Sequence, residues 1–225
     1  MPSSVTAPRR AAEPHSVGFT LAGIMLCIAM VGLSAAWGLG VFLGRQQTIL
    51  QSDDSGPRAA QTLLGRELSI PVSWFRDGPP KDKGFAGSID LRLTLPLGRN
   101  GALTQIDVTL LPQSQVRPSA SLLDGVYLHE FMPEELSGPA GLVGKPLTAT
   151  EGFENETVWY DALSATPFVA KCIAPPDGQG PAQCLRTVAL SGGIAAVYSF
   201  GADVLDNWKD FDADLKARLD SIGAS

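Results

Sequence analysis

Two cysteines, Cys172 and Cys184, stand outside a long apolar segment near the N-terminus, and turn-forming residues separate them. The run PPDG at 175–178 is typical of a turn, and the stretches on both sides are typical of strands. A hairpin centred on Gly178 would bring the cysteines opposite each other, with Cβ atoms about 4.5–5.5 Å apart, which suits a disulfide. A redox pair usually has two intervening residues, and a zinc site needs further ligands that are not visible nearby. The spacing therefore favours a structural disulfide.

His129 is the only histidine of residues 45–225, because His15 precedes the apolar segment. Glu130, Glu134 and Glu135 lie close to it in sequence. A metal site built from these side chains is one interpretation and an ordinary polar strand residue is the other; the ligand spacing gives the metal site no support. A serine triad would need His129 as its base, and the chain has no Gly-x-Ser-x-Gly elbow. We therefore assign no catalytic, cofactor-binding or metal-binding residue, and expect no cofactor.

Val17 to Leu43 is a run of 27 residues without a charged side chain. About 20 apolar residues are enough to cross a bilayer, so the run predicts a transmembrane signal-anchor at 17–43 behind a head at 1–16. A cleaved secretory signal ending at Ser34-Ala35-Ala36 is the alternative, but the apolar part of such a signal covers roughly 7–15 residues. A buried core helix is the weakest interpretation, because helices of soluble domains seldom run so far without a charge.

The charges that flank this segment predict its orientation. Arg9 and Arg10 lie in the short head, whereas Arg45 is the one basic residue that follows closely. Basic residues are enriched on the cytoplasmic side of membrane segments, so we expect a cytoplasmic N-terminus and export of residues 45–225. A disulfide needs an oxidising compartment, which agrees with this orientation. The sequence thus predicts a bacterial inner-membrane protein with residues 45–225 in the periplasm.

Small residues recur every four positions in the second half of the segment, at Gly32, Ala36, Gly40 and Gly44. This spacing places them on one face of a helix, where small side chains let two helices approach closely. The face predicts a homodimer or docking on another membrane protein. Small residues are also common in single spans without any partner role, so both interpretations stay open.

The exported part is acidic and of single-domain size. Residues 45–225 carry 15 Lys and Arg against 22 Asp and Glu, a net charge of −7. An acidic surface without a basic cluster argues against nucleic acid as a partner and against electrostatic docking on anionic lipids. Its length suffices for one domain with a proper core and hardly for two.

Alternation with a period of two predicts the strands of this domain. Apolar and polar residues alternate through 89–95 and again through 106–110, and Asn100-Gly101 between them is a strong hairpin signal. Shorter candidate strands are 68–70, 72–75, 126–131, 157–160, 168–174, 184–190 and 194–200. Residues 44–66 are polar and lack a sustained apolar period, so we interpret them as a tether. We expect 67–225 to form a mostly antiparallel β domain, either a sheet or a sandwich.

The C-terminal stretch has a helical period instead. Six apolar residues spaced by three or four positions share one side of a helix, namely Val204, Trp208, Phe211, Leu215, Leu219 and Ile222. Asp203 is a candidate cap for its start and Gly223 for its end. Asp212 with Lys216 and Asp214 with Arg218 are candidate ion pairs. The polar side is acidic, whereas interfacial membrane helices are usually basic, so we expect this helix to cover the sheet in an α+β fold.

Several stretches resemble one family of uncharacterised bacterial envelope proteins. From Pro167 onward these are PFVAKC, CLRTVAL, VYSF and LDNWKDFDADLKARL; earlier ones are Leu68 to Pro71, SWFRD, SIDLRLTLP and Gly138 to Leu142. The resemblance covers most of residues 66–222 and its motifs are structural in character. It implies one N-terminal transmembrane helix and a periplasmic domain, and no activity that could be carried over to particular residues.

Two functional hypotheses follow. The first is an accessory or interaction module of the envelope, held in place by the transmembrane segment. The second is a small-ligand binder or hydrolase that uses a pocket between the sheet and the C-terminal helix. The lack of nucleophile and cofactor motifs in the sequence favours the first. We therefore lean towards a protein that is not an enzyme.

Overall fold

The computed structural model describes residues 56–80, 84–149 and 155–225. Contacts divide the chain into two units, residues 1–49 and 50–225, and the described ranges all belong to the second. The predicted head, the predicted transmembrane segment and the predicted small-residue face lie outside them. Among the helices of the described ranges, none is long and apolar enough to cross a membrane.

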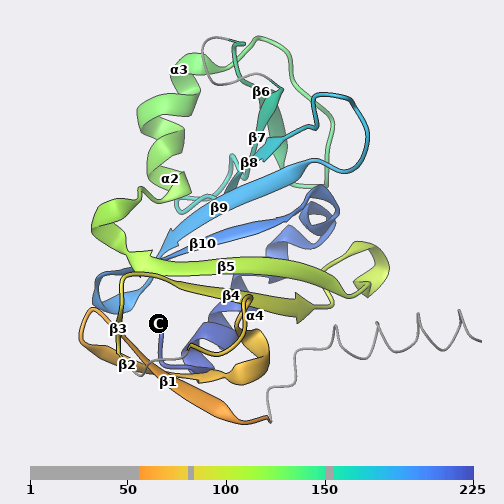
Figure 1. The fold of residues 1–225 in the computed structure, drawn as a ribbon. Helices are drawn as coiled ribbons and strands as arrows, with labels where there is room; N and C mark the ends of the chain where they lie inside the picture. Colours follow the sequence, from red (N-terminus) through yellow and green to blue (C-terminus); the bar gives the residue numbers. More distant parts are fainter. Residues whose placement is uncertain (1–55, 81–83, 150–154) are drawn as a thin grey trace, which may run out of the picture. The chain divides into compact units, whose positions relative to one another are not determined.

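A seven-stranded sheet forms the centre of the domain, in the order β4-β5-β10-β9-β8-β7-β6 (Figure 1). Its strands are β4 (Ile89–Leu95), β5 (Thr104–Pro112), β6 (Val143–Pro146), β7 (Glu156–Tyr160), β8 (Val169–Ile173), β9 (Gln183–Ala189) and β10 (Ile194–Gly201). Every neighbouring pair is antiparallel. With the helices described below, this confirms an α+β fold with mostly antiparallel sheets.

The hairpin of β4 and β5 follows directly from the sequence pattern. Leu91 lies opposite Val108, and Leu93 lies opposite Ile106, so the alternating apolar residues of both strands share one face. All four side chains are fully buried in the main core. The turn between the strands contains Asn100 at a φ of 57°, a left-handed conformation that Asn adopts more readily than most residues.

A second, three-stranded sheet corrects the predicted boundary of the tether. Strands β1 (Arg58–Leu63) and β2 (Arg66–Pro71) form an antiparallel hairpin, and β3 (Phe85–Ala86) pairs with β1. The tether prediction for 44–66 is therefore wrong from Arg58 onward. β1 buries Gln61 and Leu63, whereas the apolar Leu64 that follows is exposed, so apolar and polar residues do not alternate with burial and the strand has no recognisable period.

Two predicted strands are helical. Val72–Trp74 is a 3₁₀ turn, which buries Trp74. The strand predicted at 126–131 is also wrong, because a continuous helical segment runs through α2 (Ser119–Leu122), a π-helical turn (Leu123–Tyr127) and α3 (Leu128–Glu130). Leu123 and Tyr127, four residues apart, are both buried in a small second core with Leu147, Val158 and Val169. That helical spacing was present in the sequence.

The C-terminal helix α4 (Trp208–Ser221) covers the main core as predicted. Phe211, Leu215 and Leu219 are completely buried, and Phe211 packs against Phe200 of β10 with 4.6 Å between ring centroids. A 3₁₀ turn at Ala202–Asn207 precedes the helix, which begins without a side-chain cap, so the predicted cap at Asp203 is wrong. Gly223, at a φ of 86°, ends it as predicted.

Candidate functional site

The predicted disulfide joins two neighbouring strands. Cys172 of β8 lies directly opposite Cys184 of β9, and the two sulfur atoms are bonded. Both residues are buried, with 3% and 0% of their surfaces exposed. A buried disulfide between paired strands has a structural role, since exchange with an attacking thiolate requires access to a sulfur atom.

His129 and its acidic neighbours do not converge on one point. His129 is exposed on α3, and Glu135 forms an ion pair with Lys145 at 3.6 Å. Nowhere in the described ranges do three side chains of His, Cys, Asp or Glu come together as metal ligands would.

Strand β9 has neighbours on both sides along only part of its length. Leu185 and the residues before it pair with β8, whereas the pairing with β10 continues through Ala189. Beyond Leu185 the edge that faced β8 is open to other groups. The Thr187 N–H on this edge donates a hydrogen bond of 2.8 Å to the Ser119 hydroxyl, at the first residue of α2. A side-chain oxygen thus takes the position of a strand carbonyl.

Arg186 is the charged residue at the centre of this region. Only 6% of its surface is exposed. Its Nε donates to Asp212 Oδ1 at 2.9 Å, its Nη2 donates to Asp212 Oδ2, and its Nη1 donates to the Val169 carbonyl at 3.0 Å. The guanidinium also lies 4.4 Å from the centroid of the Phe168 ring. The bidentate pair ties α4 to β9 and satisfies a charge that would otherwise be buried alone.

This arrangement corrects one prediction made from the sequence. Asp212 pairs across space with Arg186, not with Lys216 along the helix. Lys216 instead forms an ion pair with Asp220, at 2.7 Å. Residue spacing on a helix identifies candidate pairs but cannot include a competitor from another strand.

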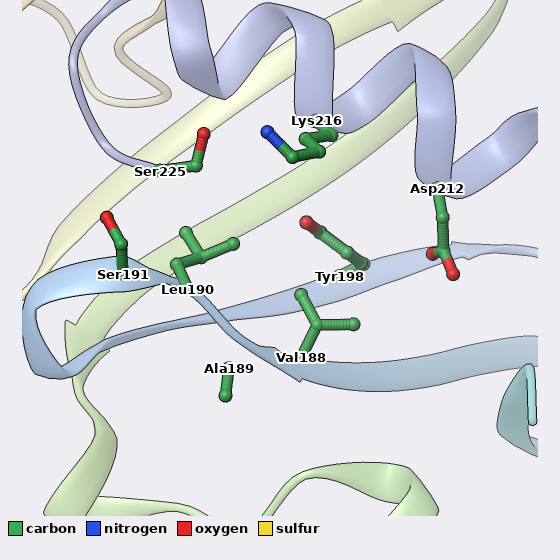
Figure 2. A pocket seen from close by; sticks show the side chains of 8 residues that line it. All are labelled: Val188, Ala189, Leu190, Ser191, Tyr198, Asp212, Lys216 and Ser225. Carbon is green, nitrogen blue, oxygen red and sulfur yellow. The ribbon is translucent and has the colours of Figure 1, made fainter. Parts of the chain in front are cut away.

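Two clefts flank the unpaired part of β9. One, of about 370 Å³, lies between the sheet and α4, and its lining includes Val188, Leu190, Tyr198 and Lys216 (Figure 2). The other, of about 510 Å³, is lined by Pro118, Ala120, Ser121, Asp124, Ala165, Thr166, Pro167, Arg186, Thr187, Val188, Ala189 and Asp212. Val188, Ala189 and Asp212 line both. We call the two clefts together, with the edge of β9 between them, the β9 groove.

The first cleft is mostly apolar with polar groups at its margin. Figure 2 shows Val188 and Leu190 on the α4 side of β9 and Ala189 on the opposite side. Burial, followed by the nearby Asp212 carboxylate, raises the pKa of Tyr198, while Arg186 acts in the opposite direction. The phenol therefore stays protonated at neutral pH and serves as a hydrogen-bond donor or acceptor. These groups are suited to binding a ligand.

Comparisons of the chain with protein-family models, with curated proteins and with solved structures found no match in any of the three. The envelope-family resemblance stays a prediction.

Sequence reasoning did not single out the residues of this groove, although one signal was present. Cys184, Arg186 and Val188 alternate along β9, so the face that buries a cysteine must also bury an arginine. Such an arginine needs a carboxylate partner, and α4 is rich in aspartate. The role of Ser119 had no comparable signal, because it depends on where β8 separates from β9.

Proposed function

We propose that this protein is a membrane-anchored binding module of the bacterial envelope, whose exported domain holds a partner protein in the β9 groove. The open edge of β9 between the two clefts carries this proposal. Exposed strand edges are templates for pairing with another chain, and most proteins cover them. Here the edge is left between two clefts and is held in position by the Arg186–Asp212 pair.

The disulfide supports the exported location. Cys172 and Cys184 are bonded across β8 and β9, and structural disulfides persist in oxidising compartments such as the bacterial periplasm. We place the N-terminus in the cytoplasm, residues 17–43 in the inner membrane and the folded domain in the periplasm. Alkaline phosphatase fused after Ser225 should then be active. An inactive alkaline phosphatase fusion, together with an active β-galactosidase fusion at the same position, would show that the orientation is the opposite of the one proposed.

Photo-crosslinking in cells tests the binding site. A benzophenone amino acid at Ser121, which lines the groove, should give one adduct of defined mass with the full-length protein. The matched control is Gln105, an exposed residue of β5 outside the groove. An absence of adducts at Ser121, or the same adducts at both positions, would argue against a partner in the groove.

The small-residue face of the transmembrane segment adds a proposal about assembly. Gly32, Ala36, Gly40 and Gly44 should bring two copies, or this chain and another membrane protein, into close helix contact. A dimerisation reporter with the wild-type segment should give a higher signal than one with Gly40→Ile. Equal signals would remove this face as a contact.

A small molecule in the first cleft is the second candidate function. The cleft between the sheet and α4 is of ligand size and is lined by Val188, Leu190 and Tyr198. Pull-downs from detergent-solubilised membranes separate the two candidates. A stoichiometric partner supports the binding module; its absence, together with small-molecule binding that Leu190→Trp abolishes, supports the second.

A further inference from the structure

We infer that the partner occupies the β9 groove as an extended segment that adds a strand to β9, with an apolar side chain directed towards α4 and basic side chains directed towards α2. This inference rests on the proposed function and specifies the chemistry of the partner. Three features of the groove carry it: the backbone groups of β9, the cleft beneath α4 and the charges around both.

At its open edge, β9 presents the unpaired backbone groups of one residue, Ala189. Leu190 N–H donates to the Ile194 carbonyl at 2.8 Å, so Val188 and Leu190 direct their backbone groups towards β10. Thr187 and Ala189, which alternate with them along the strand, face the opposite edge, where the Thr187 N–H is already bonded to the Ser119 hydroxyl. The N–H and C=O groups of Ala189 therefore point out of the sheet at the open edge, and Ala189 is exposed.

Side chains of an added strand would alternate between the two sides of the sheet. On the α4 side, an apolar side chain would enter the cleft of about 370 Å³ beside Val188, Leu190 and Tyr198. Figure 2 looks onto this space between β9 and α4. On the other side, neighbouring positions of the added strand would face Ser121 and Asp124 on the helical segment that starts with α2.

The charges of the groove favour a basic segment. Arg186 and Lys216 form ion pairs with Asp212 and Asp220. Arg66, beside the first cleft, donates to the Ser191 hydroxyl and to the Ser225 carbonyl, so each of these three cations already has a partner. Asp124 lines the second cleft and is exposed. Residues 45–225 as a whole carry a net charge of −7, which draws basic ligands to the surface. The partner chemistry is thus an extended segment in which lysine or arginine alternates with an apolar residue.

Binding of a synthetic peptide to the full-length protein in nanodiscs of neutral lipid tests the inference. The probe is fluorescein-labelled KVKVKVK, with EVEVEVE and an N-methylated KVKVKVK as matched peptides. We expect the probe to bind wild-type protein about tenfold more tightly than either matched peptide. Ala189→Pro removes the outward N–H while leaving the β10 side of the strand intact, and should weaken binding by at least the same factor.

Charge variants separate the groove from general electrostatic attraction. Asp124→Lys should weaken probe binding several-fold, whereas Glu134→Lys, the same charge change on an exposed residue outside the groove, should leave it unchanged. Equal loss in both variants would mean that net charge alone attracts the probe and would overturn the inference. A melting curve identifies any variant that fails to fold. In that case the comparison of KVKVKVK with its N-methylated form, both measured on wild-type protein, tests strand addition instead.

Each of the remaining outcomes also counts against strand addition. No binding of KVKVKVK, or equal binding to wild type and Ala189→Pro, overturns strand addition. The wild-type protein could instead form a dimer that the Ala189→Pro substitution converts to a monomer, while the probe does not bind. This result would assign the open edge to a second copy of the chain and would also overturn strand addition by a partner. If Ser121 crosslinks to a partner in cells while the probe does not bind, the binding module stands and strand addition fails.

Discussion

The two ends of strand β9 differ in how they are held. Near Cys184 the strand pairs with β8 and β10 and is fastened by the disulfide. From Arg186 to Ala189 it pairs with β10 alone, and its other edge meets a serine hydroxyl and two clefts. One strand therefore combines a closed end with an open end.

This difference indicates how a small sheet can expose a strand edge and remain well defined. At the closed end a covalent bond and main-chain pairing fix the register. At the open end the strand pairs with β10 alone, and side chains hold it in addition, through the Arg186–Asp212 pair and the packing of α4. A chain that paired with this edge would meet backbone groups that are already in position, and such preorganisation favours binding.

Loss of the packing of α4 should lower the stability of both ends of β9, and we expect it to be the largest of the effects predicted here. Phe211 is completely buried and contacts the rings of Phe168, Tyr198 and Phe200. Phe211→Ala should lower the free energy of unfolding by about 4 kcal/mol, as large-to-small core substitutions do. Trp208→Ala is the matched control and should cost about half as much, because Trp208 is only partly buried. Denaturant unfolding measures both; equal losses would mean that Phe211 is not the main anchor.

Reduction of the disulfide should loosen the closed end selectively. The bond closes a loop with a sequence separation of 12, and such a loop contributes about 3 kcal/mol in the chain-entropy model. A Cys172→Ser, Cys184→Ser variant should therefore melt at a lower temperature than the oxidised protein, while probe binding in the β9 groove persists below that temperature. An unchanged melting temperature would contradict a structural role.

The stability of the open end should depend on the ion pair between Asp212 and Arg186. Asp212→Ala leaves Arg186 buried with only the Val169 carbonyl and the Phe168 ring as partners. The loss should be about 2 kcal/mol, below the range for a fully buried pair because the Asp212 side chain is 45% exposed. Arg186→Met combined with Asp212→Leu should recover most of it. Failure of the double variant to recover stability would show that the pair has a role beyond neutralising the buried charge.

The same contrast separates what the sequence predicts from what it does not. The disulfide, the β4–β5 hairpin and the stripe of α4 are local patterns, and each was predicted. The helical segment after Pro118 was mistaken for a strand because short apolar runs fit both periods. The burial of Arg186 could be inferred from the alternation along β9, but the groove itself arises where β8 separates from β9, and no local sequence pattern marks that point.

Ser119 offers the smallest test of the open end. Its hydroxyl accepts the Thr187 N–H at 2.8 Å, the bond that takes the place of pairing with β8. Ser119→Ala should cost about 1 kcal/mol and raise the hydrogen-exchange rate of the Thr187 amide, because that donor loses its partner. The Leu185 amide, which lies in the part of β9 paired with β8, is the internal control and should exchange as before. Equal acceleration at both positions would mean that the strand opens as a whole and that its two ends are not independently held.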